Sequence, residues 1–170
     1  MTKRRVLKQL IFLKIGLMND KFIFNWILKN KLGIGTSPTK KEDVQLLKKY
    51  RIKNILGLCS EKEAKWHNNL KNDFSCQRIV LPDSNQNRIP TDIEIKNAYS
   101  ILREFINKDI TFIHCFAAIE RSPLLCILLI MEEYNLGIEE SLDYVKRVHK
   151  STNPRNSQLL LIQNFNFKNI

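Results

Sequence analysis

The chain has 170 residues, of which 44% are hydrophobic and 26% charged, so it is long enough to form one domain with a buried core. This composition excludes collagen-like and largely disordered chains. The formal net charge of +11 predicts a surface that attracts anions such as phosphorylated proteins, nucleic acid or acidic lipid.

The first 20 residues begin with a basic cluster and continue with apolar residues, which imitates a signal peptide. However, Lys8 and Lys14 interrupt the apolar run, no small-residue cleavage site follows, and the segment is too short and too charged to span a bilayer. Residues 1–20 are therefore interpreted as a loosely attached, disordered extension or as a mis-assigned start, with the true start at Met18. A helix that binds a membrane surface or a partner is the alternative. We expect no transmembrane segment, and a single domain over residues 21–170.

The rest of the sequence predicts strands that alternate with helices. The expected elements are two strands in 22–35 around a turn at 29–30, a helix over 39–50, a strand over 52–59, a helix over 61–70, a strand over 76–81, a helix over 91–107, a strand over 110–114, and helices over 122–134, 138–149 and 157–167. The strands at 52–59 and 76–81 have nearly continuous apolar ends, which is typical of strands buried on both faces. The alternation predicts an α/β fold with a central, mostly parallel sheet and helices on both faces.

The stretch FIHCFAAIERSPLL, residues 112–125, places Cys115 directly after an expected strand and Arg121 directly before an expected helix. A loop at the carboxyl end of a strand can turn its backbone amides inward and bind an anion, and the dipole of the following helix helps it to do so. The same field favours a thiolate at Cys115, which makes the cysteine nucleophilic. Arg121 can hold a phosphate through two parallel N–H bonds, and the Ser122 hydroxyl can stabilise the thiolate as a leaving group.

The alternative is a buried structural cysteine with an unrelated arginine nearby. A bare Cys-x5-Arg pattern is weak evidence, because it arises by chance in many chains. His114 before the pattern, Ser122 after it and the strand-to-helix context make a chance match far rarer. The interpretation of Cys115 as a nucleophile and Arg121 as a phosphate-binding residue is therefore favoured.

The segment HCFAAIERS resembles the H-C-x5-R-S/T signature of the protein tyrosine phosphatase superfamily, and the short chain resembles its dual-specificity branch. KLGIGTSP and DVQLLKKYRIKNILGLCSEKE resemble that branch's opening strand, helix and buried strand, so the likeness covers roughly residues 22–165. It implies a compact cysteine-phosphatase fold. It also implies hydrolysis of phosphotyrosine and/or phosphoserine and phosphothreonine in proteins through a cysteinyl-phosphate intermediate, with no metal or other cofactor.

The resemblance also implies a role for each residue of the loop. Cys115 is the expected nucleophile, Ser122 assists departure of the thiolate, and His114 orients Cys115. The phosphate oxygens are expected to bind the Arg121 side chain and the backbone amides of Phe116, Ala117, Ala118, Ile119, Glu120 and Arg121.

Asp83 is the expected general acid and base. It lies between Pro82 and Pro90 in a polar loop that follows the strand expected at 76–81. Its carboxyl group would protonate the departing oxygen and then activate water. The alternative for Asp83 is a turn-forming residue. Asp92 is a weaker candidate for the acid, because it lies in the first turn of a helix, where carboxylates are stabilising in any case.

Two residues depart from the family pattern. The family usually has glycine at the position of Ala118, and alanine with a positive φ there would cost about 1 kcal/mol. Glu120 would reduce the positive potential of the site if it pointed outward, and would oppose phosphate binding if it pointed inward. These departures support an alternative function, a catalytically weak pseudophosphatase that acts as a phosphate-dependent binding module.

Other residues suggest less specific roles. Cys59, Cys76 and Cys126 have neither zinc-site nor disulfide spacing, so core thiols in a cytoplasmic protein are expected. The histidines and tryptophans outside the loop are assigned as follows: His149 to a helix dipole, His67 to the surface, and Trp26 and Trp66 to packing. The basic charge permits nucleic-acid binding, but no aromatic-basic pattern or helix-turn-helix signature supports it. The expected partner is a phosphorylated protein or another phosphomonoester.

Overall fold

Five strands form a mixed sheet in the order β1-β2-β5-β3-β4. The computed structural model describes residues 21–83 and 86–167. The strands are β1 (Phe24–Leu28), β2 (Leu32–Gly35), β3 (Asn54–Gly57), β4 (Ser75–Arg78) and β5 (Thr111–His114). β1 pairs with β2 in an antiparallel manner, whereas the other neighbouring pairs are parallel. The prediction of a mostly parallel sheet is confirmed.

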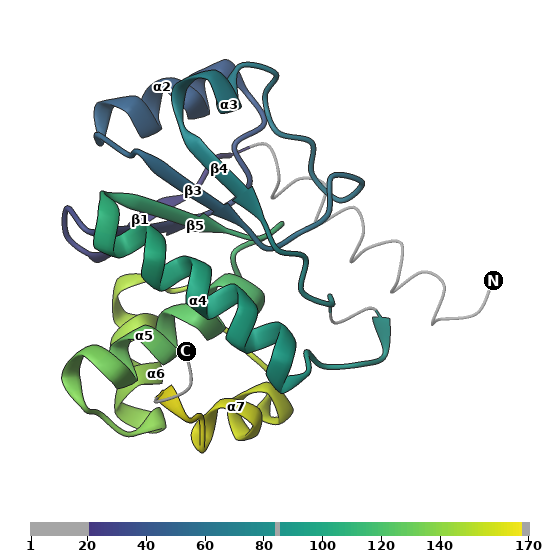
Figure 1. Cartoon of the computed structure of the whole chain (residues 1–170), viewed down its shortest axis with the longest axis vertical. Helices are drawn as coiled ribbons and strands as arrows, with labels where there is room; N and C mark the ends of the chain where they lie inside the picture. The colour runs from purple at the N-terminus through teal and green to yellow at the C-terminus, as the bar shows by residue number, and fades with distance from the viewer. Residues whose placement is uncertain (1–20, 84–85, 168–170) are drawn as a thin grey trace.

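Helices cover both faces of this sheet, as the sequence predicted. They are α2 (Lys41–Lys49), α3 (Leu70–Asp73), α4 (Asp92–Lys108), α5 (Arg121–Tyr134), α6 (Ile138–Val148) and α7 (Asn156–Gln163). Figure 1 shows α2 and α3 on one side of the sheet and α4, α5 and α6 on the other. Within the described residues, no helix combines the length and hydrophobicity needed to cross a membrane. The interpretation of residues 1–20 lies outside the part of the chain that is described.

Two hydrophobic clusters fill the space between the helices and the sheet. Alternate strand residues point to opposite faces, so Leu56 and Ile113 join the cluster beneath α4 and α5. Ile55 and Phe112 join the cluster beneath α2 and α3. α5 is buried from its first residue through Met131. The loop between β5 and α5 therefore connects two fully buried elements, which fixes both of its ends.

The prediction of a helix over 61–70 is wrong. The chain makes turns over 61–63, and the short helix α3 begins only at Leu70. The Ser60 amide donates to Glu63 Oε2 at 2.8 Å, and the Glu63 amide donates to Ser60 Oγ at 3.3 Å. These bonds close a single turn, after which the chain departs so that the side chain of Trp66 packs against the sheet.

The expectation that the strand at 76–81 is buried on both faces is also wrong. β4 is an edge strand, and its side chains are half-buried or exposed. Beyond its end, the amides of Ile79 and Leu81 donate to the carbonyls of Gly57 and Leu58 at 2.9 and 3.0 Å. The chain thus continues along β3 and delivers the following loop, with Asp83, to the carboxyl edge of the sheet.

Gly35→Ala should lower the free energy of unfolding by about 2 kcal/mol, within the usual range for overpacking. A Cβ atom at Gly35 would lie 1.8 Å from the Ile23 carbonyl oxygen, so the backbone preceding β1 has to move. Gly137→Ala is the matched control, because its Cβ would lie 3.6 Å from Glu140 Oε2, which is an ordinary van der Waals contact. Urea denaturation measures both. Equal stability losses in the two variants would contradict the close approach at Gly35.

Candidate active site

The loop that carries the cysteine pattern lies at the carboxyl end of β5. β5 ends at His114 and α5 begins at Arg121, so residues 115–120 join a buried strand to the N-terminus of a buried helix. Cys115 is only 3% exposed. Ser122 Oγ donates to Cys115 Sγ at 3.3 Å, which brings these two predicted residues together.

Ala118 has a positive φ of 55°, the conformation that glycine adopts most easily. Its side chain is fully buried. His149 Nε2 donates to the Ala118 carbonyl oxygen at 2.7 Å, and Ser151 Oγ donates to the same oxygen at 3.2 Å. Two hydrogen bonds therefore hold the loop in a conformation that costs an alanine about 1 kcal/mol.

The carbonyl groups of the loop face the segment after α6. Ala118 O is bound by His149 and Ser151, and Ile119 O accepts from the amide of Asn153 at 2.8 Å. In a planar trans peptide the N–H points opposite to the C=O. The amides of Ile119 and Glu120 therefore point away from this segment, an arrangement suited to binding an anion on the other side of the loop.

The guanidinium of Arg121 is 3% exposed and is surrounded by acceptors. Nη2 donates to Glu63 Oε1 at 2.7 Å and to Asp83 Oδ2 at 3.1 Å, and Nη1 donates to the carbonyls of Leu58 and Leu81 at 3.5 and 3.3 Å. Burial acts to lower the pKa of Arg121. The hydrogen bond to Glu63 and the nearby Cys115 and carboxylates outweigh burial, so the pKa lies above its usual value.

Asp83, the predicted acid, thus lies beside the same arginine that ends the loop. The structure brings Cys115, Ser122, Arg121 and Asp83 into one place from two segments of the chain. Asp92, the weaker candidate, lies instead at the start of α4, as expected.

Glu63 is a member of this site that the sequence did not indicate. Burial acts to raise the pKa of the Glu63 carboxyl group, but hydrogen bonds from Arg121 and Ser60 outweigh it and hold the pKa below its ordinary value. Glu63 therefore remains an anion beside Arg121. The predicted helix over 61–70 concealed this contact, because it assigned Glu63 to regular structure.

Glu120 is turned toward the outside of the loop. Its Oε1 lies 3.9 Å from Nε of Arg155, which precedes α7, and both side chains are partly exposed. Of the two orientations considered from the sequence, the outward one is observed. Glu120 thereby lowers the positive potential at the rim of the site without competing for the anion position.

His114 is fully buried at the start of the loop. Its Nδ1 lies 3.1 Å from the carbonyl oxygen of Cys115, and its Nε2 lies 2.8 Å from Nε1 of Trp66. Burial lowers the pKa of His114 to about 3; the hydrogen bond to the carbonyl group of Cys115 opposes this effect, and the charges of Arg78 and Arg121 add smaller lowering effects. The imidazole is therefore neutral at physiological pH.

The other three cysteines differ from Cys115 in their surroundings. Cys59 and Cys126 are buried, and Cys76 is half-buried. Burial raises the pKa of Cys59 and of Cys76 to about 11 in each case, and raises that of Cys126 further. These thiols stay protonated near neutral pH, in agreement with their interpretation as core residues.

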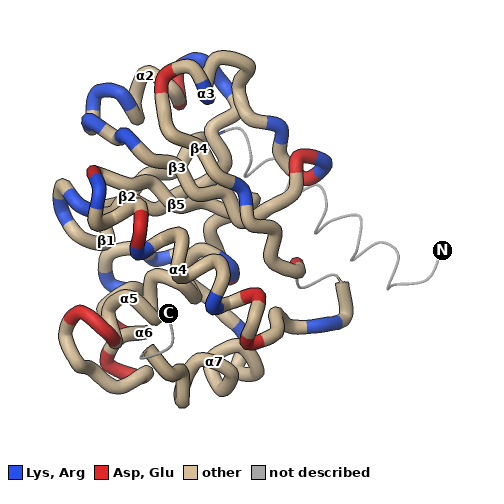
Figure 2. Tube along the Cα trace, viewed as in Figure 1, with Lys and Arg blue, Asp and Glu red and all other residues tan. Residues whose placement is uncertain are grey.

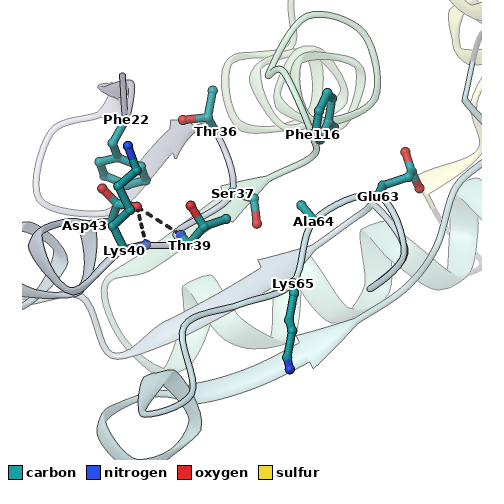
Figure 3. A pocket seen from close by; sticks show the side chains of 10 residues that line it. All are labelled: Phe22, Thr36, Ser37, Thr39, Lys40, Asp43, Glu63, Ala64, Lys65 and Phe116. Atoms are coloured by element: carbon teal, nitrogen blue, oxygen red, sulfur yellow. Dashed lines mark hydrogen bonds between the residues drawn. The ribbon is translucent and has the colours of Figure 1, made fainter. Parts of the chain in front are cut away.

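Two hollows flank the loop at Phe116. The first has a volume of about 240 Å³ and is shown in Figure 3, with these side chains around it: Phe22, Asp43, Ser37, Ala64, Glu63 and Phe116. The second has a volume of about 280 Å³ and is lined by Glu63, Asp83, Gln86 and Phe116. Glu63 and Phe116 line both hollows, so a group bound at Arg121 could extend into either of them.

The positive charge is unevenly distributed. Figure 2 shows basic segments around α2 and acidic segments around the turn between α5 and α6. α2 follows directly on the loop whose Ser37 and Lys40 line the first hollow. An anionic partner therefore meets a more favourable potential at the α2 side than at the α5–α6 turn.

These features define an α/β protein with a cysteine loop between the end of β5 and the N-terminus of α5. Residues 34–166 match the sequence model of the dual specificity phosphatase catalytic domain. The chain belongs to this family, as its resemblance to the dual-specificity branch predicted. No curated protein sequence matches the chain significantly.

Solved structures with the same fold include several phosphatases. The structure of PTPMT1 in complex with PI(5)P has a TM-score of 0.71 and 17% sequence identity, with 84% of this chain and 93% of that chain covered. A human tyrosine phosphatase-like serine/threonine/tyrosine-interacting protein has a TM-score of 0.72 at 19% identity, covering 84% and 94%. Tk-PTP in its active form has a TM-score of 0.72 at 15% identity, covering 86% and 97%.

Ala118→Gly should raise the free energy of unfolding by about 0.5–1 kcal/mol, because glycine adopts a positive φ without strain. Ala117→Gly is the matched control, since Ala117 is not among the described residues with positive φ and should lose stability from the added chain entropy. Urea denaturation compares the two. A loss of stability in both variants would contradict strain at Ala118.

The free energy of unfolding should fall as the pH is lowered from 7 to 5. Burial lowers the pKa of His114 to about 3, so His114 remains neutral in the folded state; burial also lowers the pKa of His149, and both histidines bind a proton more readily after unfolding, at an ordinary pKa of 6.5. Above pH 6.5 the two histidines make their full contribution to the free energy of unfolding. Below pH 6.5 this contribution is lost, by up to about 1.4 kcal/mol per pH unit for each histidine.

Urea denaturation at several pH values measures this slope. His149→Gln should flatten it, because this substitution removes one of the two buried imidazoles. A wild-type stability that does not vary between pH 7 and pH 5 would refute the buried neutral histidines.

Proposed function

We propose that the chain is a cysteine-dependent phosphatase that hydrolyses phosphate monoesters through a cysteinyl-phosphate intermediate. The observation that carries this proposal is the contact of Cys115 Sγ with Ser122 Oγ, at the two ends of a partly buried loop that leads into Arg121, which is paired with Asp83. Membership of the dual specificity phosphatase family supports the same chemistry.

In the first step Cys115 Sγ attacks phosphorus, and the bond between phosphorus and the ester oxygen breaks. Asp83 gives its proton to the departing oxygen. The backbone amides of residues 116–121 and the guanidinium of Arg121 hold the phosphoryl oxygens, whose charge they offset. The product is a cysteinyl phosphate and a free alcohol or phenol.

In the second step water attacks phosphorus while Asp83, now a carboxylate, takes its proton. The bond between sulfur and phosphorus breaks, and the thiolate is stabilised by the Ser122 hydroxyl, which already donates to Sγ at 3.3 Å. Inorganic phosphate leaves, and the initial protonation states of Cys115 and Asp83 are restored.

Phosphotyrosine and/or phosphoserine and phosphothreonine in proteins are the proposed substrates. The two hollows beside Phe116 give room for the group that carries the phosphate. Because PTPMT1 was solved with PI(5)P, this ligand belongs in the same substrate screen. The four free cysteines support a reducing, cytoplasmic setting for the activity.

A phosphate-dependent binding module is the second candidate, since the alanine at the strained position 118 favours it. The outward orientation of Glu120 and the bonds that hold the Ala118 carbonyl favour the enzyme instead. The two candidates share the anion site and differ only in turnover.

Metal-free hydrolysis of phenyl phosphate and p-nitrophenyl phosphate tests the proposal. Cys115→Ser and Arg121→Ala should abolish turnover of both substrates. Asp83→Asn should lower kcat for phenyl phosphate by about a hundredfold or more, and less for p-nitrophenyl phosphate, because p-nitrophenol is a good leaving group that needs little protonation. Asp92→Asn is the matched control and should retain activity.

Binding of vanadate to the wild type separates the remaining outcomes. Vanadate binding without hydrolysis of either substrate would establish the binding module. Neither binding nor turnover would overturn both candidates. An equal loss of kcat for the two substrates in Asp83→Asn would contradict the role of Asp83 as general acid.

A further inference from the structure

Gly57 leaves a space on the sheet that the indole of Trp66 occupies. Gly57 is in register with Arg78 of β4 and with His114 of β5, so the three residues form a row across neighbouring strands. A Cβ atom at Gly57 would lie 2.7 Å from Cζ2 of Trp66 and 3.0 Å from Nε2 of His114. The absence of a side chain at Gly57 therefore allows the indole to reach the imidazole.

The contact of Trp66 with His114 determines where the imidazole carries its proton. Nε1 of Trp66 lies 2.8 Å from Nε2 of His114, and an indole N–H can only donate. Nε2 must therefore be the unprotonated acceptor, which leaves the single proton of the neutral ring on Nδ1. Nδ1 then donates to the carbonyl oxygen of Cys115, 3.1 Å away.

Arg78 holds the indole in this position. Its guanidinium carbon lies 4.0 Å from the centre of the Trp66 ring, at cation–π distance. The same guanidinium donates to the carbonyls of Cys59 and Ala64, the latter at 3.2 Å. Arg78 thus binds the backbone on either side of the turn that precedes Trp66, and its charge opposes protonation of the buried imidazole.

We propose that Trp66 is a positioning residue for the phosphatase reaction, because its N–H holds His114 in the Nδ1-protonated form that binds the carbonyl group of Cys115. This inference rests on the proposed function. The bond from His114 restrains the peptide group that follows the nucleophile, and so the direction of Sγ relative to the loop amides. Without the indole N–H, the His114 proton is free to move to Nε2, which removes the donor from Cys115 O.

Two-bond ¹H–¹⁵N NMR of the histidine rings tests the protonation directly. In the wild type, the His114 signals should show a protonated Nδ1 and an unprotonated Nε2, without titration between pH 5 and pH 8. Trp66→Phe keeps a ring under Arg78 but lacks the N–H, and should show a proton on Nε2 in a substantial fraction of molecules. Trp26→Phe is the matched control, because Trp26 lies on β1 and packs against Phe24 and against Tyr50 at the end of α2.

The rate of alkylation of Cys115 by iodoacetamide, followed by mass spectrometry as a function of pH, tests the consequence for the nucleophile. The midpoint of the profile should move upward by about one pH unit in Trp66→Phe and stay in place in Trp26→Phe. The kcat for phenyl phosphate should fall about tenfold in Trp66→Phe, the effect expected from the loss of one buried hydrogen bond.

Alkylation and NMR do not depend on turnover, so they separate this inference from the proposed function. A shifted midpoint in a protein that hydrolyses nothing would support the role of Trp66 in positioning Cys115 and reject the phosphatase. If the wild type hydrolyses phenyl phosphate and the alkylation midpoint of Trp66→Phe is not shifted, the inference about Trp66 is overturned and the proposed function stands. If Trp66→Phe does not fold, the wild-type spectrum decides, and a proton on Nε2 of His114 would overturn the inference.

Discussion

The rest of the site depends on burying the charge of Arg121 at the carboxyl edge of the sheet. A buried guanidinium without partners would cost several kcal/mol, so its donors must be satisfied from the surroundings. Glu63 and the Leu58 carbonyl come from the chain after β3, and Asp83 and the Leu81 carbonyl come from the chain after β4. One charge thus fixes two loops relative to the cysteine. It also explains why Asp83, from a distant segment, lies beside the arginine that follows the cysteine loop.

The cysteine loop shows how a chain retains a conformation that its own sequence disfavours. Alanine at position 118 loses the freedom of glycine, yet φ remains positive. His149 and Ser151 bind the Ala118 carbonyl, and the amide of Asn153 binds the next one. Each hydrogen bond contributes about 1 kcal/mol, so together they exceed the strain of one residue. The strain is therefore tolerated by contacts that lie outside the loop.

Local patterns predicted most of the fold and the centre of the site. The helix cap at Thr91, the buried strand at β3 and the strand-to-helix setting of the Cys115–Arg121 segment all follow from neighbouring residues, and each is observed. Glu63, Trp66 and His149 were missed as site residues because their partners are 58, 48 and 31 positions away in the chain. No periodicity or spacing encodes such contacts. The wrong helix over 61–70 arose in the same way, since long-range partners overrode local helix preference there.

The segment after β3 connects the two ends of the cysteine loop. Trp66 donates to His114, the residue that precedes Cys115, while Glu63 accepts from Arg121, the residue that closes the loop. Glu63 and Trp66 are only three positions apart, so a displacement of this short segment moves both restraints together. Substitutions at Glu63 and Trp66 should therefore not act independently, because residues that share a network of contacts show coupled energies. Arg78, which binds the carbonyls of Cys59 and Ala64, anchors the segment to β4 and thereby to the sheet.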